Sequence, residues 1–153
     1  MKTVILAAGY ATRLYPLTKN KPKALLPVGS KTLLDHLADK IAEIPGPNPI
    51  VLVTNSRFFA ELEAWARARA PGRAVKVLDD GTSSNETRLG AVGDLQFAID
   101  KAGLDDDLLV LASDNLFDGS LADFTAFARS HEGAAAIGVF DLGIPGLAPN
   151  ATA

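Results

Sequence analysis

Short apolar segments alternate along this chain with longer stretches of helical periodicity, and the alternation restricts the fold more than any other feature. Continuous apolar runs predict buried strands at residues 3–8, 50–53, 75–78, 108–112 and 134–140. Apolar residues at helical spacing predict helices at residues 32–44, 56–70, 89–102 and 121–130. Because strands and helices that alternate in this way form βαβ units, we predict an α/β fold: a doubly wound, mainly parallel sheet with helices on both faces.

Length and composition fit a single domain. The chain has 153 residues, of which 48% are hydrophobic, and we place the domain at residues 1–142 and an irregular tail at residues 143–153. The absence of cysteine excludes disulfides, thiolate zinc sites and cysteine nucleophiles. No apolar run approaches the ~20 residues of a membrane span, and the N-terminus lacks a signal-peptide pattern. We therefore expect a cytoplasmic protein with no membrane partner.

Charge is distributed unevenly along the chain. The first 34 residues hold six basic residues and no acidic one, whereas the remainder holds nine basic and 18 acidic residues. An acidic chain does not attract nucleic acid broadly, so the local basic segment favours a small polyanion such as a nucleotide or a sugar phosphate. The competing interpretation is a solvated lysine-rich loop, which we keep for Lys19, Lys21 and Lys31.

The loop after the first predicted strand carries the features of a phosphate-binding segment. In doubly wound sheets, ligands bind beyond the carboxyl ends of the strands. Here the strand ends in Ala7, Ala8 and Gly9, small residues that let a ligand approach the backbone, where successive N–H groups can bind an anion. Arg13 and Lys23 follow and would supply positive charge, Arg13 through a bidentate contact.

Two common phosphate-binding motifs do not match this loop. The dinucleotide fingerprint G-x-G-x-x-G fails because Ala11 and Leu14 stand where its second and third glycines belong. The P-loop motif fails because Ser30 separates Gly29 from Lys31, and Ala24 stands where its first glycine belongs. A dinucleotide-binding domain is therefore the least favoured of the three functional interpretations of this chain.

The segment L-A-A-G-Y-A-T-R-L-Y-P-L-T at residues 6–18, followed by P-K-A-L-L-P-V at residues 22–28, resembles the signature of the sugar-nucleotidyltransferase family. These are the nucleoside-diphosphate-sugar pyrophosphorylases, which include glucose-1-phosphate thymidylyltransferases and uridylyltransferases. The resemblance implies their Rossmann-like fold, the nucleotide-diphospho-sugar transferase type. One departure is Ala11, which replaces the usual second glycine and requires either a negative φ or some backbone strain.

The resemblance continues to about residue 140. Asn85 stands five residues before Gly90, where the family has a polar residue that contacts the base. Asp114, in Ser113-Asp114-Asn115, follows the fourth predicted strand, where the family has a metal-binding aspartate. The resemblance thus implies Mg²⁺ as the cofactor, held by Asp114.

The implied activity is that of a transferase in sugar-nucleotide biosynthesis, which joins a nucleoside triphosphate to a sugar 1-phosphate and releases pyrophosphate. Arg13 and Lys23 would be the catalytic residues: Arg13 for the triphosphate and the leaving pyrophosphate, Lys23 for the α-phosphate and the attacking phosphate. The nucleotide would be held by Leu6, Ala7, Ala8, Gly9, Tyr10, Ala11, Thr12, Asn85 and Gly90. The amide of Asn85 suits a pyrimidine base better than a purine.

Chain length limits this interpretation. Members of the family are usually longer, and their second half supplies the residues that bind the sugar phosphate, for which we find no motif after Phe140. We therefore expect the N-terminal part of such an enzyme, which binds nucleotide but turns over weakly on its own. The alternative is a non-catalytic nucleotide-binding or regulatory module that has lost the acceptor site. The sequence leaves open the acceptor, for which an amino-alcohol phosphate is a second candidate, and the oligomeric state.

Overall fold

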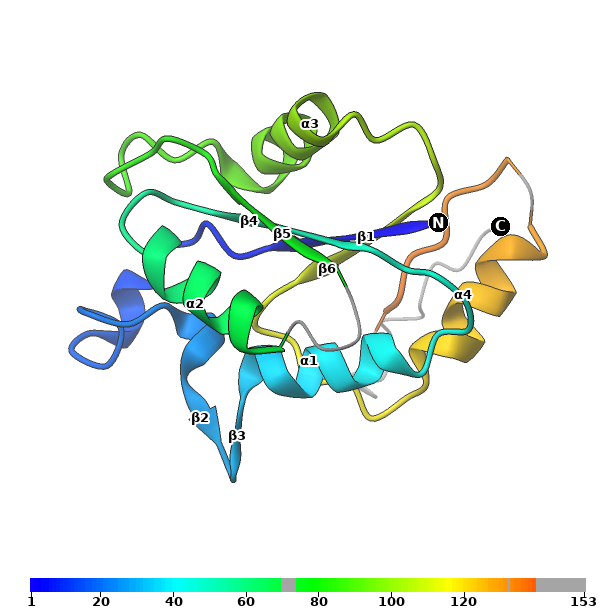
Figure 1. Ribbon diagram of the computed structural model, residues 1–153, viewed down its shortest axis with the longest axis horizontal. Helices are drawn as coiled ribbons and strands as arrows, with labels where there is room; N and C mark the ends of the chain where they lie inside the picture. The colour runs from blue at the N-terminus through cyan, green and yellow to red at the C-terminus, as the bar shows by residue number, and fades with distance from the viewer. Residues whose placement is uncertain (70–73, 132, 140–153) are drawn as a thin grey trace, which may run out of the picture.

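A four-stranded parallel sheet forms the centre of the molecule (Figure 1). The computed structural model describes residues 1–69, 74–131 and 133–139. The strands lie in the order β5-β4-β1-β6, and every neighbouring pair is parallel. Their bounds are Lys2–Leu6 for β1, Ile50–Thr54 for β4, Val75–Asp79 for β5 and Leu108–Ala112 for β6. The predicted α/β fold with a mainly parallel sheet is confirmed.

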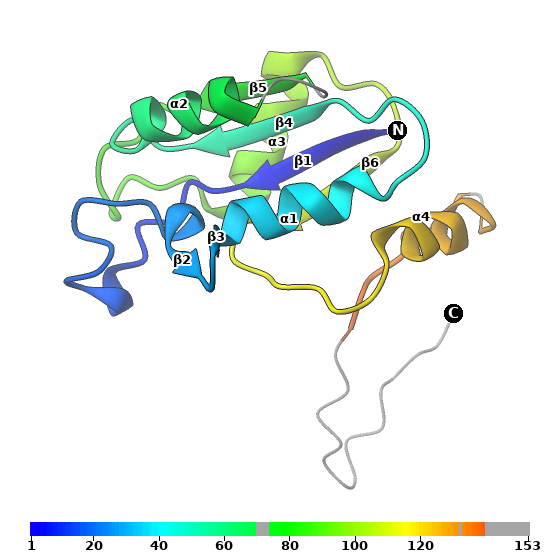
Figure 2. The same ribbon diagram turned by 60° about the horizontal axis from the view of Figure 1, so that its bottom comes forward.

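Helices cover both faces of this sheet. They are α1 at Leu33–Ala42, α2 at Phe59–Arg69, α3 at Gly90–Ala102 and α4 at Leu121–Arg129. α3 lies on one face, whereas α1 and α2 lie on the other (Figures 1 and 2). This arrangement is the doubly wound layering that the sequence pattern predicts.

Two apolar clusters, one on each face, explain why the central strands are continuously apolar. The larger cluster packs the sheet against α1, α2 and α4 and includes Ile5 and Leu52; the smaller one packs it against α3 and includes Val4 and Val53. All four side chains are completely buried. Because neighbouring residues of a strand point to opposite faces, burial on both faces calls for apolar residues at consecutive positions, as at 4–5 in β1 and 50–53 in β4.

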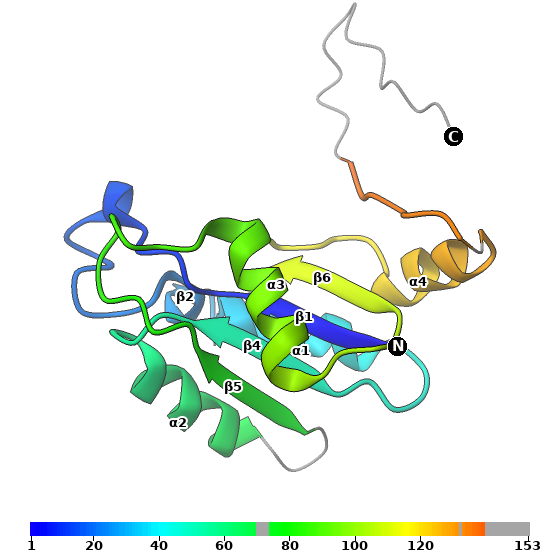
Figure 3. The same cartoon turned by 90° about the horizontal axis from the view of Figure 1, so that it is seen from above.

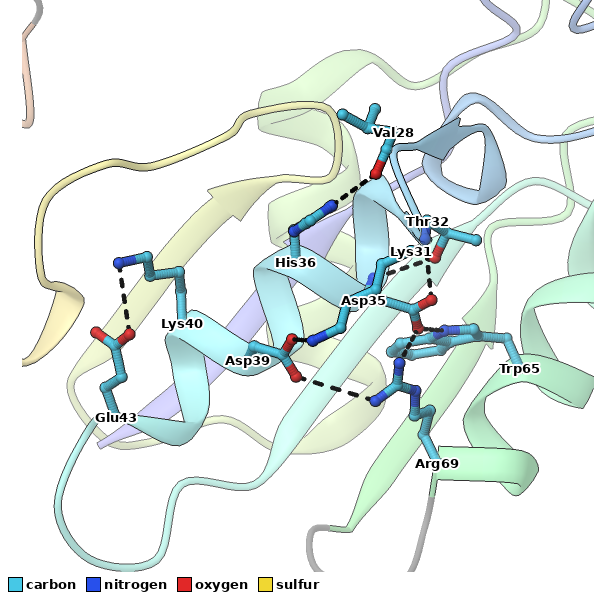
Figure 4. A network of polar contacts seen from close by, with 10 residues as sticks. All are labelled: Val28, Lys31, Thr32, Asp35, His36, Asp39, Lys40, Glu43, Trp65 and Arg69. Carbon is cyan, nitrogen blue, oxygen red and sulfur yellow. Dashed lines mark hydrogen bonds and ion pairs between the residues drawn. The ribbon is translucent and has the colours of Figure 1, made fainter.

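The start of α1 follows directly from its sequence. Thr32 Oγ1 accepts the Asp35 N–H at 3.1 Å, and Asp35 Oδ2 accepts the Thr32 N–H at 3.0 Å, which is a capping box. Asp35 also accepts Trp65 Nε1–H and pairs with Arg69, joining α1 to α2 (Figure 4). Burial acts to raise the pKa of Asp35, but hydrogen bonds from Thr32 and Trp65 and the charge of Arg69 lower it below its ordinary value.

The long loop after β1 contains more structure than its glycine and proline content indicates. Two 3₁₀ turns, η1 at Thr12–Leu14 and η2 at Lys23–Leu25, interrupt it. A two-stranded antiparallel hairpin of β2, Pro27–Val28, and β3, Lys31–Thr32, follows η2 and leads into α1. These elements are too short for a hydrophobic period to reveal them.

The strand predicted at residues 134–140 is wrong over residues 134–139, which form no strand. Ile137 and Val139 are 80% and 77% exposed in this segment, so the apolar run is not buried. A strand requires a partner for its backbone groups as well as an apolar pattern, and no described strand pairs with this segment. Phe140 and the predicted tail at 143–153 lie outside the described residues. Among the described residues, no helix combines the length and apolar character needed to cross a membrane.

Candidate functional site

Three loops meet at the carboxyl-terminal edge of the sheet (Figure 3). They follow β1, β5 and β6, and they carry the charged and polar residues singled out from the sequence. The chain places them together because all four strands are parallel and β1 lies at the centre of the sheet, between β4 and β6. This edge is where a ligand of a doubly wound sheet is expected.

Lys23 and Asp114 form an ion pair across this edge. Lys23 Nζ, on η2, lies 2.7 Å from Asp114 Oδ2, in the loop after β6, although 91 residues separate them in sequence. Their side chains are 35% and 40% exposed, so both groups can be reached by a ligand. The structure therefore brings together the predicted catalytic lysine and the predicted metal ligand.

The surroundings of Asp114 fit a magnesium ion that is shared with a substrate. A carboxylate oxygen is the ligand that Mg²⁺ prefers, and the ammonium of Lys23 shows that a cation is stabilised at this oxygen. In the described part of the chain, no group of three His, Cys, Asp or Glu residues could hold a metal by itself. One carboxylate plus substrate phosphates is a usual arrangement for Mg²⁺, so Asp114 fits it in that form only.

Ala11 has the left-handed conformation that a glycine would adopt there, with φ 46° and ψ 40°. Ala11 does not adopt the negative φ that would avoid strain, so its backbone is strained. Its carbonyl oxygen accepts the buried hydroxyl of Thr18 at 2.8 Å and the N–H of Leu14 at 3.0 Å. These two hydrogen bonds hold the tight turn of the loop in place.

Arg13 and Gly9 face open space in the same loop. Arg13 is exposed on η1 and makes no hydrogen bond or ion pair with any described residue, including Lys23 and Asp114. Gly9 is exposed, and a side chain built on it would meet no atom within 4 Å. An unpaired guanidinium and an uncovered backbone suit an anionic ligand.

The other predicted residues of this loop divide by burial. Ala7 and Ala8 are buried, and Tyr10 is only 4% exposed. Tyr10 directs its hydroxyl at Thr82 Oγ1, 3.1 Å away, so its side chain faces the protein and leaves only its backbone for a ligand. Of the remaining predicted residues, Leu6 ends β1 and is half-buried, and Thr12 begins η1 and is exposed.

Asn55 supports the loop and was not singled out from the sequence. It is completely buried: its Nδ2–H donates to the Ala8 carbonyl at 2.9 Å, and its Oδ1 accepts the Phe58 N–H at 3.1 Å. It thereby accepts a free N–H at the start of α2, where the helix predicted at residues 56–70 would place Ser56; the hydroxyl of Ser56 donates to Asp79 instead. The available signal was a polar residue placed directly between an apolar strand and a helix.

The predicted base-contacting segment lies between β5 and α3. Asn85 Oδ1 accepts a hydrogen bond from Arg88 Nη1 at 2.7 Å, which leaves the amide N–H₂ as its free donor group. Gly90 begins α3 with φ +76°, a backbone conformation that explains a glycine at this position. Asn85 and Gly90 therefore lie at the two ends of the short connection that leads into α3.

Two acidic residues behind this connection received no role from the sequence: Asp80 follows a predicted strand and suits a polar loop, and Asp94 lies within a predicted helix. Asp94, on α3, is 6% exposed, and Asp80 follows β5. Burial, then the charge of Asp80 and the hydrogen bond that protonated Asp94 can form with it, raises the pKa of Asp94 to about 6. Sequence pattern does not reveal this pair because the two residues meet only in the folded chain.

Comparison with known sequences identifies relatives for nearly the whole chain. A family model described as nucleotidyl transferase matches residues 2–143. The catalytic subunit beta of mannose-1-phosphate guanylyltransferase of Dictyostelium discoideum is 34% identical over 137 residues, which are 87% of this chain and 36% of the relative. The N-acetylmuramate alpha-1-phosphate uridylyltransferase of Caulobacter vibrioides is 40% identical over 88 residues, 55% of this chain and 35% of the relative. The chain thus spans about a third of the length of these curated relatives.

Solved structures share the fold. A UDP-glucose pyrophosphorylase complexed with UDP-glucose superimposes with a TM-score of 0.69 at 20% identity, over 84% of this chain and 53% of that one. The UDP-glucose pyrophosphorylase of Acinetobacter baumannii gives a TM-score of 0.65 at 23% identity, over 84% of this chain and 52% of that one.

The family match covers the three loops at the carboxyl-terminal edge. It includes the positions of Arg13, Lys23 and Asp114, and it extends beyond α4. Sequence match, fold and loop placement agree, so the chain belongs to the nucleotidyl transferase family.

Proposed function

We propose that this chain is the nucleotide-binding part of an enzyme that transfers a nucleotidyl group from a nucleoside triphosphate to a sugar 1-phosphate and releases pyrophosphate. The observation that carries the proposal is the accessible pair of Lys23 and Asp114 beside a loop that presents the unpaired Arg13. A nucleotidyl transferase family supplies the class of reaction. The names of the relatives, which transfer guanylyl or uridylyl groups to sugar phosphates, supply the class of acceptor.

The proposed reaction needs no proton transfer. An oxygen of the sugar phosphate attacks the α-phosphorus of the triphosphate, and the bond from that phosphorus to the bridging oxygen of pyrophosphate breaks. A phosphate monoester has a second pKa of about 6, so the attacking oxygen is already ionised near neutral pH. The main task of the protein is therefore to bring two anions together and to align them.

The basic residues of the loop after β1 perform this task. Arg13 holds the triphosphate by a bidentate contact and stabilises the charge of the leaving pyrophosphate. Lys23 contacts the α-phosphate and the attacking phosphate once its ammonium leaves Asp114. Asp114 would hold Mg²⁺, which when bound screens the charge of the triphosphate.

The base and ribose lie, in this proposal, between the backbone after β1 and the connection from Asn85 to Gly90 at the start of α3. The free amide N–H₂ of Asn85 can donate to a carbonyl oxygen of a pyrimidine, and the uridylyltransferase relative supports a pyrimidine nucleotide. The guanylyltransferase relatives favour GTP instead, so binding of GTP is the alternative outcome of the nucleotide titration.

Calorimetric titration of the chain with UTP, TTP, CTP and GTP, each with Mg²⁺, tests the nucleotide part of the proposal. We expect one nucleotide to bind, and Arg13→Ala to weaken its binding about 10–100-fold, the effect of losing a charged bidentate contact. Lys21→Ala removes an exposed charge from the same loop and serves as the matched control, with binding unchanged. Absence of binding by all four nucleotides, or equal binding by the Arg13→Ala chain, would contradict the proposal.

Measurement of pyrophosphate release separates the enzyme from the non-catalytic module. With the bound nucleotide and a panel of sugar 1-phosphates, we expect slow release by this chain, since it spans about a third of its curated relatives. Release that depends on the sugar phosphate supports the enzyme. Nucleotide binding without release in any protein that carries this chain would favour the regulatory module.

A further inference from the structure

Asp80 and Asp94 each have a buried carboxylate oxygen with no hydrogen-bond partner among the described residues. The two atoms are Asp80 Oδ2 and Asp94 Oδ1. A buried, unpaired carboxylate is strongly destabilising, and proteins rarely retain one. Two such atoms on neighbouring carboxyl groups therefore require a common explanation.

Among the described residues, the groups that act on Asp94 supply no positive charge. α3 packs against β1 and β4 through an apolar cluster that includes Val4, Val51 and Val53, so these strands present no titratable group to it. From β5 and its loop, Asp80 is the charged group that acts on Asp94; Lys76, on the same face of β5, is exposed and is not among the causes of the shift in the pKa of Asp94. The neighbouring Asp79 is turned away, since its Oδ1 accepts hydrogen bonds from Ser56 and Gly81.

The other charged residues near this connection do not supply a positive charge to Asp94 either. The guanidinium of Arg88 is bound to Asn85, and the pKa of Glu86 is lowered by a hydrogen bond from Ser84. A protonated carboxyl group has one O–H donor, so a single proton on Asp94 can be donated to Asp80 and satisfies both unpaired oxygens. The raised pKa of Asp94 agrees with this arrangement.

The carboxyl pair stands between the two parts of the proposed nucleotide site. Asp80 uses its other oxygen, Oδ1, to accept the Thr82 N–H at 2.7 Å. Thr82 Oγ1 in turn lies 3.1 Å from the hydroxyl of Tyr10, in the loop after β1. On the opposite side, Asp94 lies one turn into α3, the helix that begins at Gly90. A continuous series of residues thus connects the start of α3, beside the proposed base-contacting segment, to the loop after β1, which is proposed to bind the phosphates.

We propose that Asp94 is a positioning residue for nucleotide binding: by sharing a proton with Asp80, it holds the start of α3 against residues 80–82 and so keeps the two nucleotide-binding loops in one arrangement. This inference rests on the proposed function. When Asp94 ionises, two carboxylates repel each other at this point, and the two loops separate. Nucleotide binding by the wild-type chain, relative to a chain that cannot ionise at position 94, is therefore stronger at pH 5 than at pH 8.

Calorimetric titrations with UTP and with GTP between pH 5 and pH 8 test the inference. Asp94→Asn replaces the shared proton by an amide donor that is present at every pH, so its affinity should not depend on this ionisation. The nucleotide has a phosphate that titrates near pH 6, but this effect cancels when the two chains are compared. We expect the ratio of wild-type to Asp94→Asn dissociation constants to rise about tenfold from pH 5 to pH 8. Asp100→Asn, on the exposed side of α3, is the matched control.

A constant ratio across this pH range would overturn the inference. A chain that binds neither nucleotide at any pH contradicts the proposed function instead, and the carboxyl pair is then tested by itself. Carbon-13 NMR of the Asp94 carboxyl group, followed over the same pH range, should show a midpoint near pH 6. A midpoint near the ordinary aspartate value of about 4 would overturn the shared proton whether or not nucleotide binds.

Discussion

The loop after β1 and the loop after β5 border the same edge of the sheet but are built differently. The side chains of Arg13 and Lys23 in the first loop make no hydrogen bond or ion pair with the described residues, apart from the accessible pair of Lys23 with Asp114, and Gly9 leaves its backbone exposed. The second loop is held by hydrogen bonds at nearly every polar residue, as Asp79 and Thr82 show. Residues that act on a ligand are left free, whereas residues that support them use up their hydrogen-bonding capacity within the protein.

This contrast separates two kinds of mutational effect. Changes in the first loop should lower activity and leave the free energy of unfolding nearly unchanged, because an exposed ion pair contributes only about 0–1 kcal/mol. Changes to the buried support should lower the free energy of unfolding and reach activity only through the geometry of the loops.

Replacing Lys23 by Ala should reduce the rate of pyrophosphate release about 10²–10³-fold, the usual effect of removing a group that stabilises charge in the transition state. The midpoint of urea unfolding should shift very little. Lys21→Ala is the control for loss of charge in the same loop. An equal loss of rate in both variants would show that Lys23 contributes no more to the reaction than a solvated lysine does.

Asp94 should make stability depend on pH. Its folded pKa of about 6 exceeds the ordinary value of 3.8, so the stabilising effect of the bound proton is complete below about pH 4 and is lost as the pH rises through 6. The loss is roughly 3 kcal/mol for a shift of about two pKa units. The measurement is the difference in urea unfolding free energy between wild-type and Asp94→Asn chains at pH 4 and pH 7. A difference that does not change between these pH values would show that Asp94 carries no special proton.

Replacing Asn55 by Ala should lower the free energy of unfolding by about 2 kcal/mol. The substitution leaves the Ala8 carbonyl and the Phe58 N–H without their buried partner. Asn20, which is exposed in the loop after β1, provides a matched control with an expected change below about 0.5 kcal/mol. Similar effects of the two substitutions, measured by urea unfolding, would contradict the distinction between support and surface.

The smallest effect is expected from Ala11→Gly. Glycine relieves the left-handed strain of about 1 kcal/mol, but its greater freedom in the unfolded chain offsets part of the gain, so the free energy of unfolding should rise by about 0.5 kcal/mol. Ala126→Gly, on the exposed side of α4, should have the opposite sign, with a loss of about 1 kcal/mol. A loss of stability in both variants would mean that Ala11 carries no strain.

Sequence patterns predict the elements of this fold where a residue's own neighbours determine its structure. The apolar runs locate β1 and β4 because both faces of these strands are covered, and the capping box of Thr32 and Asp35 locates the start of α1. The pattern at residues 134–139 fails because strand formation also requires a partner that the pattern does not encode. The hairpin of β2 and β3 is too short to have a period.

The same distinction applies to the site. Lys23 and Asp114 could be named from the family motif, and their pairing at one edge follows from the parallel sheet. Asn55 and the pair of Asp80 with Asp94 could not be found from sequence, since each depends on contacts between segments distant in the chain. Tyr10 could be named, but the direction of its side chain depends on Thr82, more than 70 residues away.

The ion pair of Lys23 and Asp114 has a consequence for the salt dependence of nucleotide binding. Lys23 already has an anionic partner in Asp114. A nucleotide phosphate that binds the Lys23 ammonium therefore replaces one anion by another and does not neutralise an isolated cation. After this exchange the Lys23 ammonium is still paired with one anion, so the net charge around it is unchanged. The carboxylate of Asp114, which the exchange releases, becomes available to a cation. Ionic strength should therefore affect the contribution of Lys23 to nucleotide affinity much less than that of Arg13, which has no partner to exchange among the described residues.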